Sequence, residues 1–276
     1  MGKKIILMTG SELRHEFFRK FISIQKNIKV LSSYCESSRG DLSEVIQRQS
    51  KTNELRKNHL YEREFYEKDF FKVFCDSIED KSNPIFIERG EINNHETVTR
   101  IIDLDPDIIL SYGCSIIRSE LLEFFSGRFI NIHLGLSPYY RGSGTNFWPF
   151  VNNELQFIGT TFMHIDKGVD TGEIIHQIRG KIYINDNIHQ IGNRLIKDSI
   201  AECAKIIVSF DQLEKMNNFK INSNEERYYK KKDFTEESLE IAYKNLSEGA
   251  ILKYLQNKIE LEKQYPIIEN PKILNL

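Results

Sequence analysis

The sequence predicts an α/β protein with a mainly parallel sheet flanked by helices and a small C-terminal α+β appendage. Three observations lead to this expectation. Short apolar runs alternate with segments of helical periodicity through most of the chain, and glycines directly follow several of those runs. After about residue 216 the composition shifts to Asn, Lys, Glu and Tyr. Strands that alternate with helices are typical of a parallel sheet covered on both faces.

The expected strands follow the apolar runs. The first is KIILMT at residues 4–9, and Gly10 and Ser11 follow it before a helical pattern starts. Ser11 is therefore expected to be the N-cap of that helix. Further strands are expected at residues 28–31, 84–87, 107–112, 129–134, 157–165 and 173–178.

The expected helices lie between these runs, at residues 96–104, 118–125 and 188–210, with another at 249–263. Residues 40–80 are rich in Glu, Lys and Arg with interspersed aromatics, which predicts one or two long amphipathic helices with a solvated charged face over an aromatic core stripe. We divide the chain into a domain at residues 1–215 and a small C-terminal region at residues 216–276. In that region, residues 219–230 are expected to form a strand pair.

Composition excludes several classes of protein. The net charge is −2, from 38 basic and 40 acidic residues, so no chain-wide basic field is available for nucleic acid. No stretch approaches the ~20 apolar residues needed to cross a bilayer, and the apolar run near the start is too short for a signal peptide. We expect a soluble cytoplasmic protein with reduced cysteines and no zinc site, because no CxxC pair occurs among Cys35, Cys75, Cys114 and Cys203.

A polar pair lies on the strand expected at residues 129–134. Asn131 and His133 are two positions apart, so their side chains share one face of the strand while the neighbouring isoleucines face the core. The strand then ends in the loop LGLSPYYRGSG. Ligands in parallel α/β sheets bind beyond the C-terminal ends of the strands. An amide and an imidazole are therefore expected where a ligand would bind.

A second polar feature is the loop Gly168-Val169-Asp170-Thr171-Gly172, in which two glycines bracket an acid. Asp170 could reach His133, orient the imidazole ring and stabilise its protonated form. Taken alone, each feature has an ordinary structural explanation. An Asn-x-His pair is often a hydrogen-bonded strand end, and a Gly-x-Asp-x-Gly segment is often only a turn. The order and spacing of the two features together favour a catalytic site.

The combined pattern resembles the folate-dependent formyltransferase family. The resemblance is carried by NIHLGLSPYYRG at residues 131–142 and GTTFMHIDKGVDTG at residues 159–172, with the dipeptide Tyr112-Gly113 in addition. It implies a Rossmann-like fold, 10-formyltetrahydrofolate as co-substrate and no metal. By the same resemblance, Asn131 donates to the formyl oxygen, His133 lies beside the reacting carbon, and Asp170 supports His133 and the proton transfer.

The resemblance also implies where the folate binds. Relatives hold the pterin largely through backbone groups beside one strand end, with a second loop closing the other side. The corresponding residues here are Tyr112, Gly113, Cys114, Ser115, Ile116, Ile117, Ile165, Asp166, Lys167 and Gly168. Cys114 is expected to be a lining residue rather than a nucleophile, and His164 either touches folate or fills the strand. One departure is Gly135, where many relatives carry serine; here a serine follows at Ser137 instead.

The acceptor amine is less well determined. Methionyl-tRNA formyltransferases share the core and resemble this chain at Arg141-Gly142 and Trp148, but they carry a longer C-terminal barrel than the 56 residues after Lys220 could form. The near-neutral charge also disfavours tRNA. GSELRH at residues 10–15 and YRGSGTNFWP at residues 140–149 are similar to nucleotide-sugar N-formyltransferases, which serve O-antigen and other lipopolysaccharide synthesis.

We therefore expect the acceptor to be a nucleotide-linked amino sugar. Its implied contacts are Tyr139, Arg141, Gly142, Thr145, Asn146 and Trp148, although Trp148 could equally be a core residue. The strand pair in the C-terminal region resembles the hairpin through which sugar formyltransferases form homodimers. Two alternatives stay open: an enzyme like methionyl-tRNA formyltransferase that acts on another amine, and a non-catalytic folate-binding relative.

Overall fold

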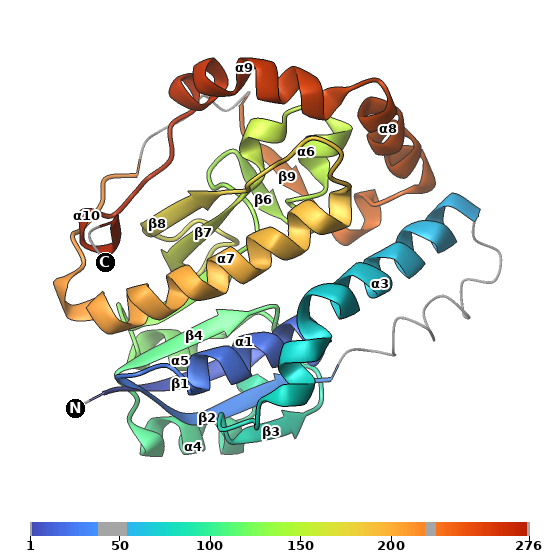
Figure 1. Cartoon of the computed structure of the whole chain (residues 1–276). Coiled ribbons are helices and arrows are strands. Elements are labelled where there is room, and N and C mark those ends of the chain that lie inside the picture. The colour runs from blue at the N-terminus through green and yellow to red at the C-terminus, as the bar shows by residue number, and fades with distance from the viewer. Residues whose placement is uncertain (1, 38–53, 219–224, 275–276) are drawn as a thin grey trace.

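A computed structural model of the chain describes residues 2–37, 54–218 and 225–274 (Figure 1). Its main sheet has seven strands in the order β3-β2-β1-β4-β5-β7-β8. The strands are β1 (Lys3–Thr9), β2 (Ile28–Glu36), β3 (Pro84–Ile87), β4 (Ile108–Tyr112), β5 (Phe129–His133), β7 (Gly159–His164) and β8 (Ile174–Arg179). The first five are parallel to one another, whereas β7 and β8 run antiparallel to their neighbours. The mainly parallel sheet predicted from the sequence is confirmed.

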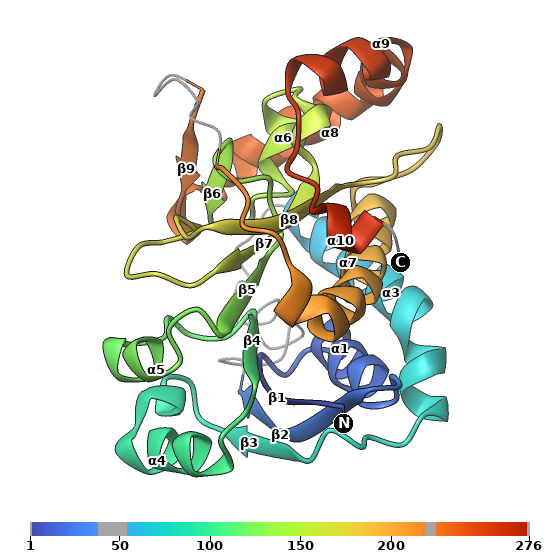
Figure 2. The ribbon, with the colours of Figure 1, turned by 90° about the vertical axis from the view of Figure 1, so that its left-hand side faces the viewer.

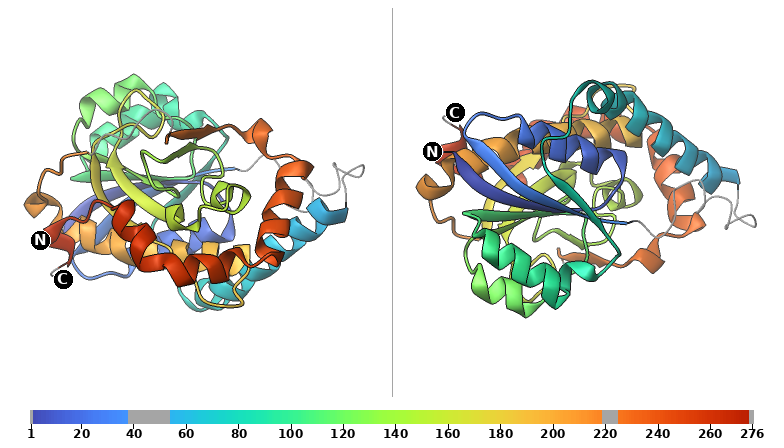
Figure 3. Two further views of the ribbon diagram at one scale, coloured as in Figure 1. Left: turned by 90° about the horizontal axis from the view of Figure 1, so that it is seen from above. Right: turned by 90° about the horizontal axis from the view of Figure 1, so that it is seen from below.

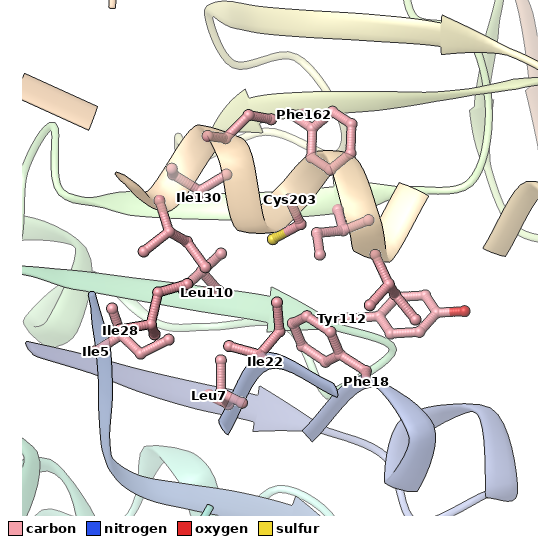
Figure 4. Packing of buried hydrophobic residues seen from close by; sticks show 14 of the residues in the cluster. Ile5, Leu7, Phe18, Ile22, Ile28, Leu110, Tyr112, Ile130, Phe162 and Cys203 are labelled. Atoms are coloured by element: carbon pink, nitrogen blue, oxygen red, sulfur yellow. The ribbon is translucent and has the colours of Figure 1, made fainter. Parts of the chain in front are cut away.

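Helices cover both faces of the sheet, as Figures 2 and 3 show. One face carries α1 (Leu13–Ser23), α3 (Glu54–Ser77) and α7 (Ile188–Ser209), and the other carries α4 (His95–Leu104) and α5 (Ser119–Phe124). Figure 4 shows part of the first core, where Phe18 from α1 and Cys203 from α7 meet sheet residues such as Leu110. The helix α1 begins at Leu13 with Glu12 as its N-cap, so the N-cap predicted at Ser11 is wrong by one residue.

The helix α3 covers most of the described part of the charged segment at residues 40–80; residues 38–53 lie outside the described residues. Phe71 is fully buried, and its ring centroid is 4.8 Å from that of Phe17 on α1. Tyr61 and Phe65 are instead mostly exposed, at 58% and 65%. The aromatic residues of this segment therefore do not form one core stripe, because only some of them fall on the face that packs against α1 and α7.

The C-terminal region lies against the rest of the chain. It contains β9 (Arg227–Tyr229), α8 (Glu236–Ser247), α9 (Ala250–Gln264) and α10 (Pro271–Leu274). Residues of α8 and α9 share a core with α7 and with residues near α6 (Trp148–Val151). The short 3-10 helices are η1 (Glu91–Asn93), η2 (Leu155–Phe157), η3 (Phe210–Gln212) and η4 (Lys231–Asp233). The boundary at residue 216 stays a prediction, and α8 was not expected from the sequence.

The strand pair expected at residues 219–230 falls partly on residues 219–224, which lie outside the described residues. The described strand β9 pairs in parallel with β6 (Tyr140–Gly142), on the loop that follows β5. These two strands form a sheet separate from the seven-stranded one. Across residues 2–37, 54–218 and 225–274, no helix combines the length and apolar character needed to cross a membrane.

Candidate active site

Asn131 lies on β5 beside Ser111 of β4, its register partner. The Ser111 hydroxyl donates a hydrogen bond to Asn131 Oδ1 over 2.9 Å. With its oxygen engaged in this way, the amide turns its NH₂ group toward Asp170, and the Nδ2-to-Oδ1 distance is 3.5 Å. Ser111 therefore fixes which end of the Asn131 amide faces the site. Ser111 was not predicted, because a single hydroxyl within an apolar strand is not a distinctive sequence signal.

His133 and Asp170 lie together as the sequence predicts. His133 Nδ1 is 3.3 Å from Asp170 Oδ1, and both side chains are almost fully buried. The other imidazole nitrogen, Nε2, is 3.1 Å from the backbone oxygen of Tyr140. A carbonyl oxygen can only accept, so Nε2 carries the hydrogen in this contact. Nδ1 then meets the carboxylate favourably when it is protonated as well, and the arrangement suits the positively charged ring.

Asp170 is held by backbone as well as by side chains. It has φ +52°, in the left-handed region, and its Oδ2 accepts a hydrogen bond from Gly142 N–H over 3.0 Å. The loop that carries it is organised by Asp166, whose carboxylate accepts from Gly168 N–H and from the Thr171 hydroxyl. The left-handed conformation turns the Asp170 carboxylate inward from an otherwise exposed loop. The predicted Gly-x-Asp-x-Gly segment is thus a hydrogen-bonded loop that directs the Asp170 carboxylate toward His133.

A cavity of about 310 Å³ opens beside these residues at the C-terminal ends of β4 and β5. Asn131, Asp170 and Ser111 line it, whereas His133 lies behind them and does not. The predicted folate contacts also line it, with the exception of Tyr112, whose ring is buried in the core beside His15 and Phe18. The predicted site residues therefore make up about two thirds of the cavity wall, and Tyr112 supports it from within the core.

The loop after β4 carries much of that wall, and two side chains hold it. Glu36, buried at the end of β2, accepts from Ser115 N–H over 2.6 Å and from Gly90 N–H over 2.8 Å. Asn93 donates to Ile116 O over 3.0 Å and accepts from Arg118 N–H over 2.8 Å. Sequence reasoning missed both side chains, because nothing along the chain shows that these separate segments meet.

Two titratable side chains in the cavity wall, Cys114 and His164, have shifted pKa values. Burial, with a contribution from the Glu36 carboxylate, raises the pKa of the Cys114 thiol to about 12. A protonated thiol is a poor nucleophile, which suits Cys114 as a lining residue. Burial lowers the pKa of His164, which also lines the cavity. Among the residues that the structure describes, no cluster of three or more His, Cys, Asp or Glu side chains could hold a metal ion.

The predicted acceptor contacts divide into two groups. Gly142 lines the cavity, and Arg141 lies near the surface, where it pairs with Glu226 and lies over the ring of Tyr228. The rings of Tyr139 and Trp148 are buried, and Trp148 is stacked on Tyr229 with its centroid 4.1 Å away. Of the two roles considered for Trp148, the structure shows that of a buried core residue.

Two further predicted acceptor contacts have structural roles near β5. Thr145 is buried and its hydroxyl donates to Leu134 O, and Asn146 Oδ1 accepts from Gly159 N–H. Thr145 also explains the departure at Gly135. A Cβ at Gly135 would lie 2.6 Å from both His133 Nε2 and Thr145 Oγ1. Thr145 therefore occupies the space into which a side chain at position 135 would extend.

The fold and this cavity define an α/β protein with an Asn-His-Asp group beside a ligand-sized space. A family model described as formyl transferase matches residues 30–205, which is more than half of the chain. The chain therefore belongs to the formyl transferase family.

Curated relatives agree with this family. The chain is 34% identical over 124 residues to methionyl-tRNA formyltransferase of Desulforamulus reducens, covering 44% of this chain and 37% of that protein. It is 33% identical over 107 residues to the Clostridium tetani enzyme of the same name, covering 38% and 34%. The chain thus aligns with a little over a third of the length of these relatives.

Solved structures share the fold. A 4-N formyltransferase from Francisella tularensis has a TM-score of 0.54 at 19% identity, covering 87% of this chain and 86% of its own. Phosphoribosylglycinamide formyltransferase from Anaplasma phagocytophilum has a TM-score of 0.54 at 11% identity, covering 84% and 100%. An N-formyltransferase from Helicobacter canadensis has a TM-score of 0.51 at 19% identity, covering 85% and 73%.

Proposed function

We propose that this protein transfers a formyl group from 10-formyltetrahydrofolate to the amine of a nucleotide-linked amino sugar. A dTDP- or GDP-linked 4-amino-4,6-dideoxyhexose is the expected type of acceptor, and the product would serve surface polysaccharide synthesis. We further propose a cytoplasmic homodimer. The observation that carries the proposal is the convergence of Asn131, His133 and Asp170 at one end of a cavity.

The cavity wall fits a folate through its backbone. The loop at residues 113–117 is irregular and lines the cavity, so its peptide groups are not all used within a strand or helix. Ile116, which is 80% exposed, and Val169 contribute apolar surface to the cavity wall. When bound, the folate supplies the formyl group. Cys114 and the loop at residues 165–168 would flank it.

The three polar side chains supply what amine attack on a formyl carbon requires. Negative charge develops on the formyl oxygen, and a fixed donor stabilises it more than mobile water does. The Asn131 NH₂, oriented by Ser111, is such a donor. When the His133 ring is protonated, it adds positive charge next to Asp170. Asp170, which lines the cavity, takes the proton that the amine loses, directly or through water.

The proposed acceptor is supported by charge and by likeness. With a net charge of −2, the chain lacks the overall positive field that favours tRNA. The Helicobacter canadensis structure was solved with folinic acid and dTDP-3-aminofucose, and the Francisella tularensis structure is described as a 4-N formyltransferase. A second candidate acceptor is methionyl-tRNA, because the curated relatives described above are methionyl-tRNA formyltransferases.

The test is incubation with 10-formyltetrahydrofolate and a panel of nucleotide-linked amino sugars, with unformylated methionyl-tRNA included. Mass spectrometry of each acceptor should show the mass of an added formyl group on a nucleotide sugar. Formylation of the tRNA with none of the sugars modified would overturn the proposed acceptor. Absence of transfer to every acceptor, with folate still bound, would instead favour a non-catalytic folate-binding protein.

The catalytic residues are tested with a matched pair of substitutions. Asp170→Asn keeps the shape of the side chain but removes its capacity to take a proton, and we expect at least a hundredfold loss of kcat. Asp198→Asn makes the same chemical change on α7, where Asp198 pairs with the exposed Lys181, and should leave kcat unchanged. His133→Ala should likewise abolish transfer in a folded protein. Equal activity in both Asp variants would refute the role assigned to Asp170.

A further inference from the structure

The catalytic pair His133–Asp170 is held by the backbone of one short strand, β6. Tyr140 O contacts His133 Nε2, and Gly142 N–H donates to Asp170 Oδ2. These two contacts engage both members of the pair from the same edge of β6. The position of β6 therefore decides how the imidazole and the carboxylate meet.

The other edge of β6 is paired with β9, which lies in the C-terminal region. Arg227 N–H donates to Tyr139 O over 2.8 Å, and Ser143 N–H donates to Tyr229 O over 2.8 Å. Backbone groups of successive residues in a strand point to alternate edges. Residues 139 and 143 thus face β9, whereas residues 140 and 142 face the catalytic pair. No other strand among the described residues pairs with β6.

Side chains fix β9 in this place. Arg227 forms an ion pair with Glu154 through both Nε and Nη2, and Glu154 also accepts from the Tyr140 hydroxyl. Asn152 donates to the hydroxyls of Tyr140 and Tyr229, at 2.8 and 2.9 Å. The side-chain amide of Asn152 therefore links Tyr140 on β6 to Tyr229 on β9.

The backbones of β6 and β9 also approach each other closely. Gly142 has φ +95°, and a Cβ on it would lie 2.1 Å from Tyr229 O. Only glycine lets the two strands come this near at the residue whose N–H reaches Asp170. The Tyr229 ring also stacks on Trp148, with an interplanar angle of 8°. The same segment that contacts the catalytic carboxylate is thus shaped to receive β9.

From this arrangement we infer that β9 is a positioning element of the active site: the backbone groups of Arg227 and Tyr229 hold β6, and β6 keeps His133 and Asp170 aligned. The inference rests on the proposed function for its catalytic meaning. It assigns the C-terminal region a role inside its own chain, whether or not that region also forms a dimer contact. Arg227 and Tyr229 act through β6 and touch neither reacting atom.

Three variants distinguish the backbone hydrogen bond from Arg227 to Tyr139 from the ion pair between Arg227 and Glu154. Arg227→Pro removes the N–H that donates to Tyr139 O, together with the ion pair to Glu154. Arg227→Ala removes only the ion pair. Tyr228→Pro introduces the same ring one residue along, at a position whose N–H faces away from β6. Proline is compatible with extended backbone at both places, so the two proline variants are matched.

The first measurement is steady-state formyl transfer, with the number of folate sites per chain titrated in parallel. We expect Arg227→Pro to lower kcat at least tenfold and to shift the midpoint of the pH–rate profile. The variant should still bind one folate per chain, and its KM for the folate should stay within twofold of wild type. Arg227→Ala should give a smaller loss, and Tyr228→Pro should match wild type. A fall in kcat matched by a fall in folate sites, at an unchanged midpoint, would show a role in folding alone and overturn the inference.

The second measurement does not depend on activity. ¹⁵N NMR of the histidine rings, with His133 assigned by its loss in His133→Gln, reports which ring nitrogen carries hydrogen. In wild type and Tyr228→Pro the Nε2 hydrogen beside Tyr140 O should exchange slowly with solvent, and in Arg227→Pro it should exchange at least tenfold faster. An unchanged His133 signal in Arg227→Pro would overturn the inference. An inactive wild-type protein with this NMR difference intact would instead reject the proposed function and leave the positioning role standing.

Discussion

At the scale of single residues, the orientation of one amide depends on one hydroxyl. Ser111 is nearly fully buried, and it engages the Asn131 oxygen so that the NH₂ faces the cavity. An unconstrained amide would present either end, and a carbonyl oxygen there would repel the charge that develops on the formyl oxygen. The donor role proposed for Asn131 therefore depends on its orientation by Ser111.

Ser111→Ala should lower kcat for formyl transfer by about tenfold, which corresponds to about 1.4 kcal/mol and to the usual contribution of one hydrogen bond. The KM for the folate should change little, because Ser111 is one of many cavity residues. Steady-state kinetics at saturating acceptor give both values. Ser199→Ala removes another buried, hydrogen-bonded serine on α7 and serves as the control, with lower stability but normal kcat. A Ser111→Ala enzyme with wild-type kcat would argue against this orienting role.

At the scale of elements, the loop after β4 depends on a carboxylate from a neighbouring strand. Each oxygen of Glu36 accepts one backbone N–H, from Ser115 and from Gly90. The loop and the segment before η1 are thereby joined through a single side chain. A cavity wall made of backbone keeps its shape only while such contacts hold.

Glu36→Gln should raise the KM for the folate about tenfold while kcat at saturation stays within twofold. The reason is that the glutamine NH₂ would face one of the two N–H donors, so one contact is lost and the loop at residues 113–117 loosens. Glu88→Gln changes an exposed acid that bonds Ser37 and should behave as wild type. A lower kcat with an unchanged KM in Glu36→Gln would mean that this loop does not hold the folate.

The elements also show what the sequence could and could not predict. Apolar runs followed by glycine located β4 and β5, and the Gly-x-Asp-x-Gly pattern located the loop of Asp170, since those signals are local. The pairing of β6 with β9 was missed because both are three-residue strands without alternation, and their partners lie far apart in the chain. Glu36 was missed for the same reason, as its two partners come from two separate loops. Local pattern thus located the cavity, and contacts between distant segments determine its shape.

At the scale of the whole molecule, α3, α7 and α8 meet at two buried histidines. His59 Nδ1 is 3.0 Å from the Tyr243 hydroxyl, and the ring centroids of His59 and His189 are 4.7 Å apart. Burial, reinforced by Arg63 and Arg56, lowers the pKa of His59 to about 4. Burial, with His59 and Arg63 nearby, lowers the pKa of His189 to about 3. Glu62 also faces this junction, 3.8 Å from His189 Nε2.

This junction should make the protein less stable in mild acid. Between pH 6.5 and about 4 the unfolded chain binds protons at these histidines and the folded chain does not, so the free energy of unfolding falls as the pH falls. Each histidine contributes a slope of up to about 1.4 kcal/mol per pH unit. Denaturant unfolding of His59→Gln between pH 7 and 4.5 should show a shallower slope than wild type. His95→Gln, which alters an exposed histidine, should keep the wild-type slope; equal slopes in all three proteins would contradict the prediction.

The pairing of β6 with β9 also bears on the order in which the protein is made. A ribosome delivers Asn131, His133 and Asp170 well before it delivers Arg227, and N-terminal segments fold first during synthesis. If β9 aligns His133 and Asp170 as inferred, a nascent chain can form its parallel strands early while it is still catalytically inactive. The chain then becomes active in formyl transfer only late in synthesis, after β9 has emerged and paired with β6.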